Sequence, residues 1–155
     1  MNKLILFLII GVLFVVGCSN NNPVNETCDD ITCNAVLDTE HTINIDKLEI
    51  YHFHATHQCY SCITVGAYAE ETVNTYFADE LESGKIVFGH VNVDLLENID
   101  LATKYEVTGS SLWLGIYDKN GFHKEENVNV WYKISNKQGY MNYLKGIIEQ
   151  KLAGE

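Results

Sequence analysis

Two cysteines separated by two residues, Cys59 and Cys62, stand between a strand-like run and a helix-like run, and this placement constrains the fold more than any other feature. The preceding run, LEIYHFH at 48–54, is rich in β-branched and aromatic residues, which is typical of a strand. The following run, 59–84, has apolar residues at near-helical spacing and ends on a glycine, which favours a long helix. A cysteine at a helix start faces unpaired N–H groups and the positive end of the helix dipole, so its thiolate is stabilised.

The rest of the chain alternates between strand and helix patterns. The first three predicted strands are separated by helices, which suggests parallel βαβ units, and a hairpin then adds an antiparallel edge. Asn-Gly between two strand runs is the strongest short hairpin signal. The pattern therefore predicts an α/β fold with helices on both faces of a central sheet. The further elements are a strand at 85–94, a helix at 96–106 ended by Thr108-Gly109, a strand at 111–118, a turn at Lys119-Asn120-Gly121, a strand from 122 and a last helix to 152 capped by Ser135 or Asn136.

The N-terminus carries a targeting pattern. Lys3 precedes an apolar run at 4–16 that is too short to span a bilayer comfortably. The run ends in VVGC at 15–18, which resembles the bacterial lipobox. The resemblance implies a lipoprotein signal peptide at 1–17 and a diacylated Cys18 as the mature N-terminus. We therefore expect a protein anchored by lipid to the cell membrane and facing the periplasm or the exterior; the alternative is an uncleaved membrane anchor.

The next segment, 18–41, is polar and contains the only proline, Pro23. Its composition cannot bury a core and predicts a tether. Cys28 and Cys33 lie in it, and outside the cytoplasm such thiols tend to oxidise. We expect a local structural disulfide between them, and a second dithiol that passes electrons to Cys59 and Cys62 is the alternative.

The charge pattern excludes one class of partner. The chain has 21 acidic and 10 basic residues, a net charge of −11, and every basic residue is lysine. Without arginine there is no bidentate recognition of phosphate, and the acidic surface opposes binding to nucleic acid. Lipid, rather than surface charge, must therefore hold the protein at a membrane.

The CxxC motif and its setting resemble the thioredoxin superfamily. A CxxC pair between a strand and a helix of a βαβ pattern is a strong signal of this kind. The resemblance implies, for residues 42–155, a thioredoxin-like α/β fold with a central mixed sheet of four or so strands flanked by helices on both faces. The residues that carry it are CYSC at 59–62, VNVD at 91–94, the helix ending in Lys104-Tyr105, VTG at 107–109 and the hairpin with Asn120-Gly121. More narrowly, the HxxxxCxxC start and AYAEE at 67–71 resemble small thioredoxin-like proteins associated with arsenic-resistance or nitroreductase genes.

The sequence departs from the superfamily at two points. Thioredoxins have a cis-proline opposite the dithiol, next to the backbone that pairs with substrate. In this chain Gly109-Ser110-Ser111 falls at that point and contains no proline. We therefore expect a trans or reshaped loop, with Ser110 and Ser111 near the substrate. Thioredoxins also carry a buried acid on the first strand, and 51–54 offers no carboxylate.

Histidines are candidates to replace that acid. His52 and His54 alternate along the strand and are expected to point to one side, either as core residues or as part of the site. His57 lies two residues before Cys59, where it would favour the thiolate when protonated or act as a base when neutral. His90 and His123 are interpreted as structural or exposed.

Three functions are compatible with these residues. The first is a lipid-anchored thiol–disulfide oxidoreductase without a cofactor, with Cys59 as nucleophile, Cys62 as resolving thiol and His57 as tuning residue, acting on an extracytoplasmic protein or a small thiol-reactive compound. The second is a protein that binds a thiophilic metal (copper, zinc or arsenite) through Cys59, Cys62, His57 and His54. The third is a non-catalytic binding module with the same fold.

Overall fold

The computed structural model describes residues 44–154. The expected lipidation of Cys18, the disulfide between Cys28 and Cys33, and the signal and tether boundaries lie outside the described residues. Between residues 44 and 154, no helix has both the length and the apolar character needed to cross a membrane. In chain order the elements are β1 (Lys47–His54), α1 (Tyr60–Tyr76), α2 (Ala78–Glu82), β2 (Ile86–Asn92), the 3-10 helix η1 (Leu96–Asn98), α3 (Ile99–Tyr105), β3 (Ser111–Asp118), β4 (Gly121–Glu126), the 3-10 helix η2 (Val128–Lys133) and α4 (Lys137–Ala153).

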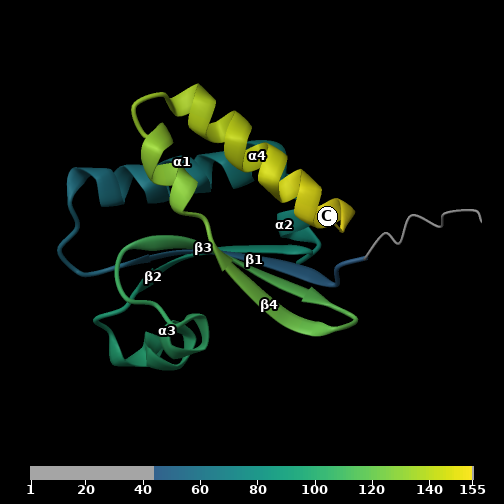
Figure 1. The fold of residues 1–155 in the computed structure, drawn as a ribbon, viewed down its shortest axis with the longest axis horizontal. Coiled ribbons are helices and arrows are strands. Elements are labelled where there is room, and N and C mark those ends of the chain that lie inside the picture. The colour runs from purple at the N-terminus through teal and green to yellow at the C-terminus, as the bar shows by residue number, and fades with distance from the viewer. Residues whose placement is uncertain (1–43, 155) are drawn as a thin grey trace, which may run out of the picture. The chain divides into compact units, whose positions relative to one another are not determined.

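Four strands form one mixed sheet in the order β2-β1-β3-β4. β1 and β2 run parallel, β3 is antiparallel to β1, and β4 is antiparallel to β3. Helices α1 and α4 cover one face of the sheet, and α3 lies on the other face (Figure 1). The predicted α/β class, with a four-stranded mixed sheet flanked by helices on both faces, is confirmed.

The prediction that the first three strands are all parallel is wrong, because β3 runs against β1. The connection from β2 to β3 contains only η1 and the seven-residue helix α3. A helix of that length spans about 10 Å, whereas a strand of eight residues spans about 26 Å. α3 therefore cannot return the chain to the far end of the sheet, and β3 starts at the end where β2 finished.

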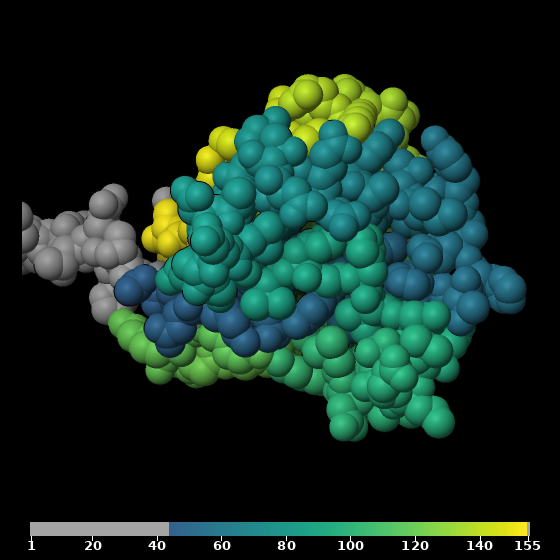
Figure 2. All heavy atoms as spheres, turned by 180° about the vertical axis from the view of Figure 1, so that it is seen from behind, coloured from purple at the N-terminus to yellow at the C-terminus, as the bar shows by residue number. Residues whose placement is uncertain are grey.

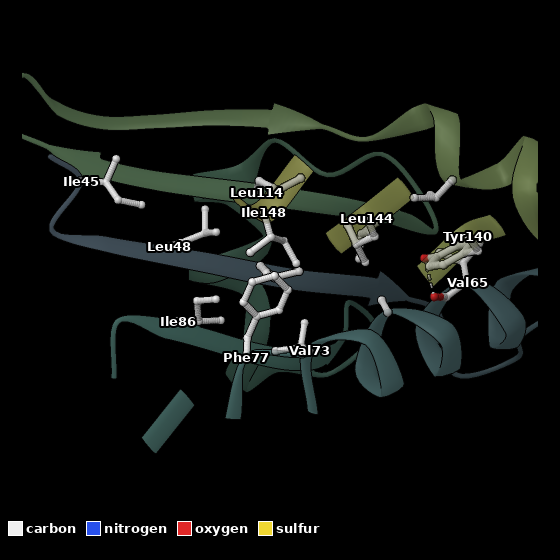
Figure 3. Close-up of a cluster of buried hydrophobic side chains, with 14 residues drawn as sticks. Ile45, Leu48, Val65, Val73, Phe77, Ile86, Leu114, Tyr140, Leu144 and Ile148 are labelled. Atoms are coloured by element: carbon white, nitrogen blue, oxygen red, sulfur yellow. Dashed lines mark hydrogen bonds between the residues drawn. The ribbon is translucent and has the colours of Figure 1, made fainter. Parts of the chain in front are cut away.

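The larger core lies between the sheet and the helices α1 and α4 (Figure 3). Tyr140 on α4 donates a hydrogen bond from its hydroxyl to the carbonyl of Val65 on α1, 2.8 Å away, so the two helices are joined by a polar contact inside an apolar layer. A smaller core on the α3 face is built around Phe53, Val91 and Tyr105. Alternation along β1 separates the two cores, with Leu48 and Ile50 on one side and Phe53 on the other.

Two helix boundaries differ from the sequence-based prediction. The helix predicted at 59–84 is split, because the chain leaves helical geometry at Phe77 (φ −134°, ψ 35°), whose side chain is buried in the larger core. The helix before β3 ends at Glu106, which has a left-handed backbone (φ 55°), rather than at Thr108-Gly109.

Two turn and cap predictions are confirmed. β3 and β4 form the expected hairpin, in which Asp118 pairs with Gly121, and Gly121 has a positive φ of 109° that favours glycine. Asn136 caps α4 by accepting a hydrogen bond from the backbone N–H of Gly139, 3.0 Å away.

The topology brings two loops together at one edge of the sheet. β1 and β2 are parallel, so both end there, and the backbone N–H of Thr56 after β1 donates to the carboxylate of Asp94 after β2 at 2.7 Å. Helix α1 begins directly after the first of these loops. Figure 2 shows this segment, in blue, reaching the surface at one end of the domain. The dithiol at the start of α1 therefore lies at the solvent-exposed end of the sheet where β1 and β2 finish.

Candidate functional site

Cys59 is the N-cap residue of α1. Its backbone is extended (φ −77°, ψ 165°), and its sulfur accepts a hydrogen bond from the backbone N–H of Cys62 at 3.2 Å. The predicted position at the helix start is thus confirmed, and a thiolate there would be stabilised by an N–H group that the helix leaves unpaired. Both cysteines are free thiols in this structure, with Cys59 exposed and Cys62 half-buried.

The Cys62 thiol is easier to ionise than an ordinary thiol. Burial raises its pKa, but hydrogen bonds from the side chains of Cys59 and Ser110 and from backbone groups of the CxxC turn outweigh burial. The net result is a pKa below the ordinary value of 9. The two sulfurs interact directly, so the lowered pKa describes a dithiol that gives up its first proton easily.

The loop before β3 brings one of its two serines to the dithiol. The side chain of Ser110 bonds to Cys62. The hydroxyl of Ser111 is buried and used internally, since it donates to the carbonyl of Gly109 at 3.0 Å and accepts from the indole N–H of Trp113 at 3.0 Å. All peptide bonds among residues 44–154 are trans, as expected for this loop.

His57 lies on the surface between β1 and α1. It lies near enough to Asp94 to act on that carboxylate, whose pKa is lowered chiefly by the hydrogen bond from the backbone N–H of Thr56, with smaller contributions from His57 and His54. His57 is therefore held near an acidic group in the loop that precedes Cys59. Its role as a tuning residue stays a prediction.

His52 and His54 lie on the same side of β1, as predicted, and their rings stack with centroids 5.4 Å apart. His52 is 1% exposed, and its Nδ1 lies 3.0 Å from Nδ1 of His90 on β2. Nε2 of His90 in turn lies 3.4 Å from the carboxylate of Glu70 on α1. Position 66 of α1 is glycine because the His52 ring packs on it: a Cβ there would lie 2.6 Å from Cε1 and 2.9 Å from Cγ of the ring.

The contacts from His52 through His90 to Glu70 were not predicted from the sequence, in which His90 was interpreted as structural or exposed. The signal that reveals them is strand register. β1 and β2 pair so that His52 lies directly beside His90. Two parallel strands that each carry a histidine at the same level place both imidazoles on one face of the sheet.

The residues considered for a thiophilic metal are Cys59, Cys62, His57 and His54. Within 44–154, no three His, Cys, Asp or Glu side chains are gathered as ligands of one ion. Of the set considered for a thiophilic metal, Cys59 and Cys62 are adjacent, whereas Nδ1 of His54 donates to the carbonyl of Ala55 at 2.9 Å.

Comparison with solved structures finds chains that match at low sequence identity. One crystal structure of human ERp44 matches with 21% identity and a TM-score of 0.44, covering 75% of this chain and 32% of that one. A second, form I, matches with 18% identity and a TM-score of 0.45, covering 81% and 30%. The first two thioredoxin domains of Eps1p from Naumovozyma dairenensis match with 17% identity and a TM-score of 0.41, covering 65% and 34%.

The chain thus spans about a third of each of these proteins. No protein-family model and no curated protein sequence matches it.

Proposed function

We propose that this protein is a thiol–disulfide oxidoreductase whose working groups are Cys59 and Cys62. The observation that supports it is an exposed thiol at a helix N-cap, with its sulfur bonded by the N–H of a second cysteine whose own pKa is lowered. Thiolate character and access are what decide cysteine reactivity in disulfide exchange.

The reaction has two steps in the reducing direction. The Cys59 thiolate attacks one sulfur of a substrate disulfide, a mixed disulfide forms, and the other substrate sulfur leaves as a thiolate that takes up a proton. Cys62 then loses its proton and attacks the sulfur of Cys59, which releases the second substrate thiolate. The substrate gains two electrons and the dithiol becomes a disulfide; oxidation of a substrate dithiol is the reverse. The substrate class is an extracytoplasmic protein or a small thiol compound, reached at the edge formed by Ser110 and the start of α1.

Trapping tests this assignment. Glutathione disulfide is mixed with the full chain carrying Cys62→Ser, in a background with Cys28→Ser and Cys33→Ser, and the Cys59 peptide is examined by mass spectrometry. We expect a stable glutathione adduct on Cys59, and a much slower adduct on Cys62 in the matched Cys59→Ser variant. Faster reaction of Cys62 would reverse the assigned roles, and equal inertness of both thiols would refute the proposed function.

We propose in addition that a lipid on Cys18 holds the protein at the extracytoplasmic side of a membrane. The VVGC sequence after a short apolar run supports this. A Cys18→Ala variant should remain unprocessed and carry no lipid label when cells are fed a labelled fatty acid. Cleavage after Gly17 together with membrane retention in that variant would contradict the proposal.

A further inference from the structure

The two edges of the sheet differ in how they are protected. β4, at one edge, ends in three charged residues, Lys124, Glu125 and Glu126. β2, at the other edge, reads IVFGHVN and contains neither a lysine, an acidic residue nor a proline. Charged side chains and prolines are what natural edge strands use to prevent pairing with another chain. β2 therefore lacks the protection that β4 has.

The backbone of β2 presents a row of hydrogen-bonding groups at this edge. Its ladder to β1 begins where the N–H of Leu48 donates to the carbonyl of Lys85 at 2.8 Å, and it ends where the N–H of Val93 donates to the carbonyl of His54 at 2.9 Å. Because successive residues of a strand direct their N–H and C=O groups to opposite sides, the odd-numbered residues of 85–93 face β1 and the even-numbered ones face outward. Within residues 44–154, no strand pairs with the outward groups of Ile86, Phe88 and His90.

The two faces of the sheet differ in character beside this edge. On the face covered by α1, the Glu70 carboxylate lies 3.4 Å from the ring of His90 and is 52% exposed. Helix α2 packs on the same face through Leu81, and it carries three acidic residues that are not buried, Asp79, Glu80 and Glu82. These four carboxylates outnumber Lys85, which precedes the strand and donates to the carbonyl of Ile45. On the α3 face, β2 carries only small side chains or none, at Val87, Gly89 and Val91.

We propose that the β2 edge binds an extended polypeptide segment, with basic side chains at alternate positions, as a fifth strand of the sheet. In strand addition the main-chain hydrogen bonds supply affinity, and alternate side chains supply specificity. Basic side chains on one face match the carboxylates of α1 and α2, and small apolar ones on the other face match the valines. A second copy of this chain fits the edge less well, because a symmetric pair would bring the acidic groups of both copies together.

The inference rests on the proposed oxidoreductase function for one further step, that the segment belongs to a substrate protein. β2 ends beside the loop that precedes Cys59, since the backbone N–H of Thr56 donates to Asp94 at 2.7 Å. A polypeptide that lies along β2 and continues past Asn92 therefore arrives at the end of the sheet that carries the dithiol. This placement favours a protein over a small thiol compound as the substrate.

Amide hydrogen exchange of the full chain tests the docking without using activity. The probe is an end-blocked peptide of alternating lysine and valine with the seven-residue length of β2. The outward amides of Phe88 and His90 should exchange fast in the free chain and at least about tenfold more slowly with excess peptide, because they become hydrogen-bonded. The inward amides of Gly89 and Val91 are the control within the same strand and should be slow in both samples.

Two results of this measurement would overturn the docking. The first is an unchanged exchange rate of the outward amides when the peptide is added. The second is slow exchange of these amides in the free chain, which would show that another part of the chain or a second copy already covers the edge.

Modified peptides test the kind of contact. N-methylation of every second residue removes half of the peptide's donors, and the two alternate patterns remove opposite halves. The pattern that blocks the N–H groups facing β2 should abolish protection, whereas the other pattern should keep it. Equal effects of the two patterns would overturn strand addition. A peptide of alternating glutamate and valine should protect the outward amides far less, and equal protection would overturn the preference for basic side chains.

A protein variant tests the charge of the site independently. Glu70→Gln should weaken binding of the lysine–valine peptide about two- to threefold, the scale of one exposed ion pair. Glu149→Gln removes the same charge from an exposed position on α4 and should leave binding unchanged. Equal affinities of the two variants would overturn the contribution of Glu70.

Transfer kinetics test whether the docked segment belongs to a substrate. Two lysine–valine peptides carry a cysteine in mixed disulfide with glutathione, one at each end of the peptide. In the Cys62→Ser variant, the peptide that places its disulfide beyond Asn92 should bond to the Cys59 sulfur, with glutathione leaving as the thiol, at least about tenfold faster than glutathione disulfide reacts. Equal rates for both peptides and glutathione disulfide would overturn the substrate step. Failure of Cys59 to react with any disulfide would instead refute the proposed function, and hydrogen exchange then decides the docking alone.

Discussion

A hydrogen atom in place of a side chain at position 66 allows the ring of His52 to lie against α1. Gly66→Ala would gain about 1 kcal/mol of helix propensity, but its methyl group would collide with a buried ring, and overpacking of this kind costs about 1–3 kcal/mol. We expect a net loss of stability, measured by urea unfolding. Gly146→Ala on α4 is the matched control, since nothing lies within 4 Å of its Cβ position, and it should stabilise the protein. Equal stabilisation by both changes would show that the ring does not pack there.

His52 also predicts a pH dependence of folding. Its pKa is lowered from 6.5 to about 4 in the folded protein, chiefly by burial. As pH falls below 6.5, His52 becomes protonated in the unfolded chain but stays neutral in the folded protein. The free energy of unfolding therefore decreases between pH 6.5 and 4, by roughly 3 kcal/mol in total. Urea unfolding of His52→Leu over this range should lack that loss, whereas His123→Gln should keep it. A parallel slope in His52→Leu would contradict the assignment.

At the scale of elements, one carboxylate joins α3 to the sheet. Glu49 on β1 is buried, and Lys47, Tyr105 and Tyr117 donate hydrogen bonds to it at 2.8, 2.8 and 2.9 Å. Lys104 adds an ion pair at 3.2 Å from α3. Tyr105 in turn fits only because position 115 is glycine. The cluster therefore adds polar contacts between α3 and the strands β1 and β3 to the apolar packing of the smaller core.

We predict that Glu49→Gln destabilises the protein by about 3 kcal/mol, because it removes the negative charge that faces two lysines and replaces one of the two acceptor oxygens by an NH2 group that cannot accept a hydrogen bond. Burial raises the pKa of Glu49, but the hydrogen bonds from its four donors lower the pKa by more than burial raises it. The net pKa is therefore below the ordinary 4.5. Its stabilising contribution is therefore present above pH 4.5 and is lost as pH falls through the lowered pKa. The control is Glu149→Gln, an exposed i,i+4 partner of Lys145, which should change the urea midpoint little. An equal effect of both changes would refute the role of Glu49.

Patterns of neighbouring residues predicted most of the helices and strands and the position of the dithiol. They did not predict which strands pair, or which residues far apart in the sequence are in contact. The strand before Cys59, the hairpin at Gly121 and the cap at Asn136 follow from patterns within a few residues. The direction of β3 depends on the length of a connection, and the acceptor role of Glu49 depends on tyrosines 56 and 68 positions away. The contact between His52 and His90 requires the register of two strands. None of these three features can be predicted from the composition of a short stretch of sequence.

At the scale of the whole molecule, redox state and stability are linked through the dithiol. Only the reduced protein has the thiol protons, and the Cys62 pKa is below its ordinary value of 9 when the chain is folded. A lowered thiol pKa stabilises the folded reduced protein at pH values above it, fully so above pH 9, and this stabilisation is lost as pH falls through the lowered pKa. The oxidised protein has no such contribution.

We therefore predict that the free energy of unfolding of the reduced protein rises relative to that of the oxidised protein as pH rises through the lowered Cys62 pKa towards pH 9. The measurement is urea unfolding of the full chain with Cys28→Ser and Cys33→Ser, in excess dithiothreitol and after oxidation. A variant that also carries Cys59→Ser and Cys62→Ser should follow the pH dependence of the oxidised protein, because it too lacks the thiol protons. Since a folded state that favours the thiolate disfavours the disulfide, the same difference makes the folded dithiol pair a better oxidant than the unfolded one. Parallel curves for the reduced and oxidised protein would show that the fold does not stabilise the thiolate.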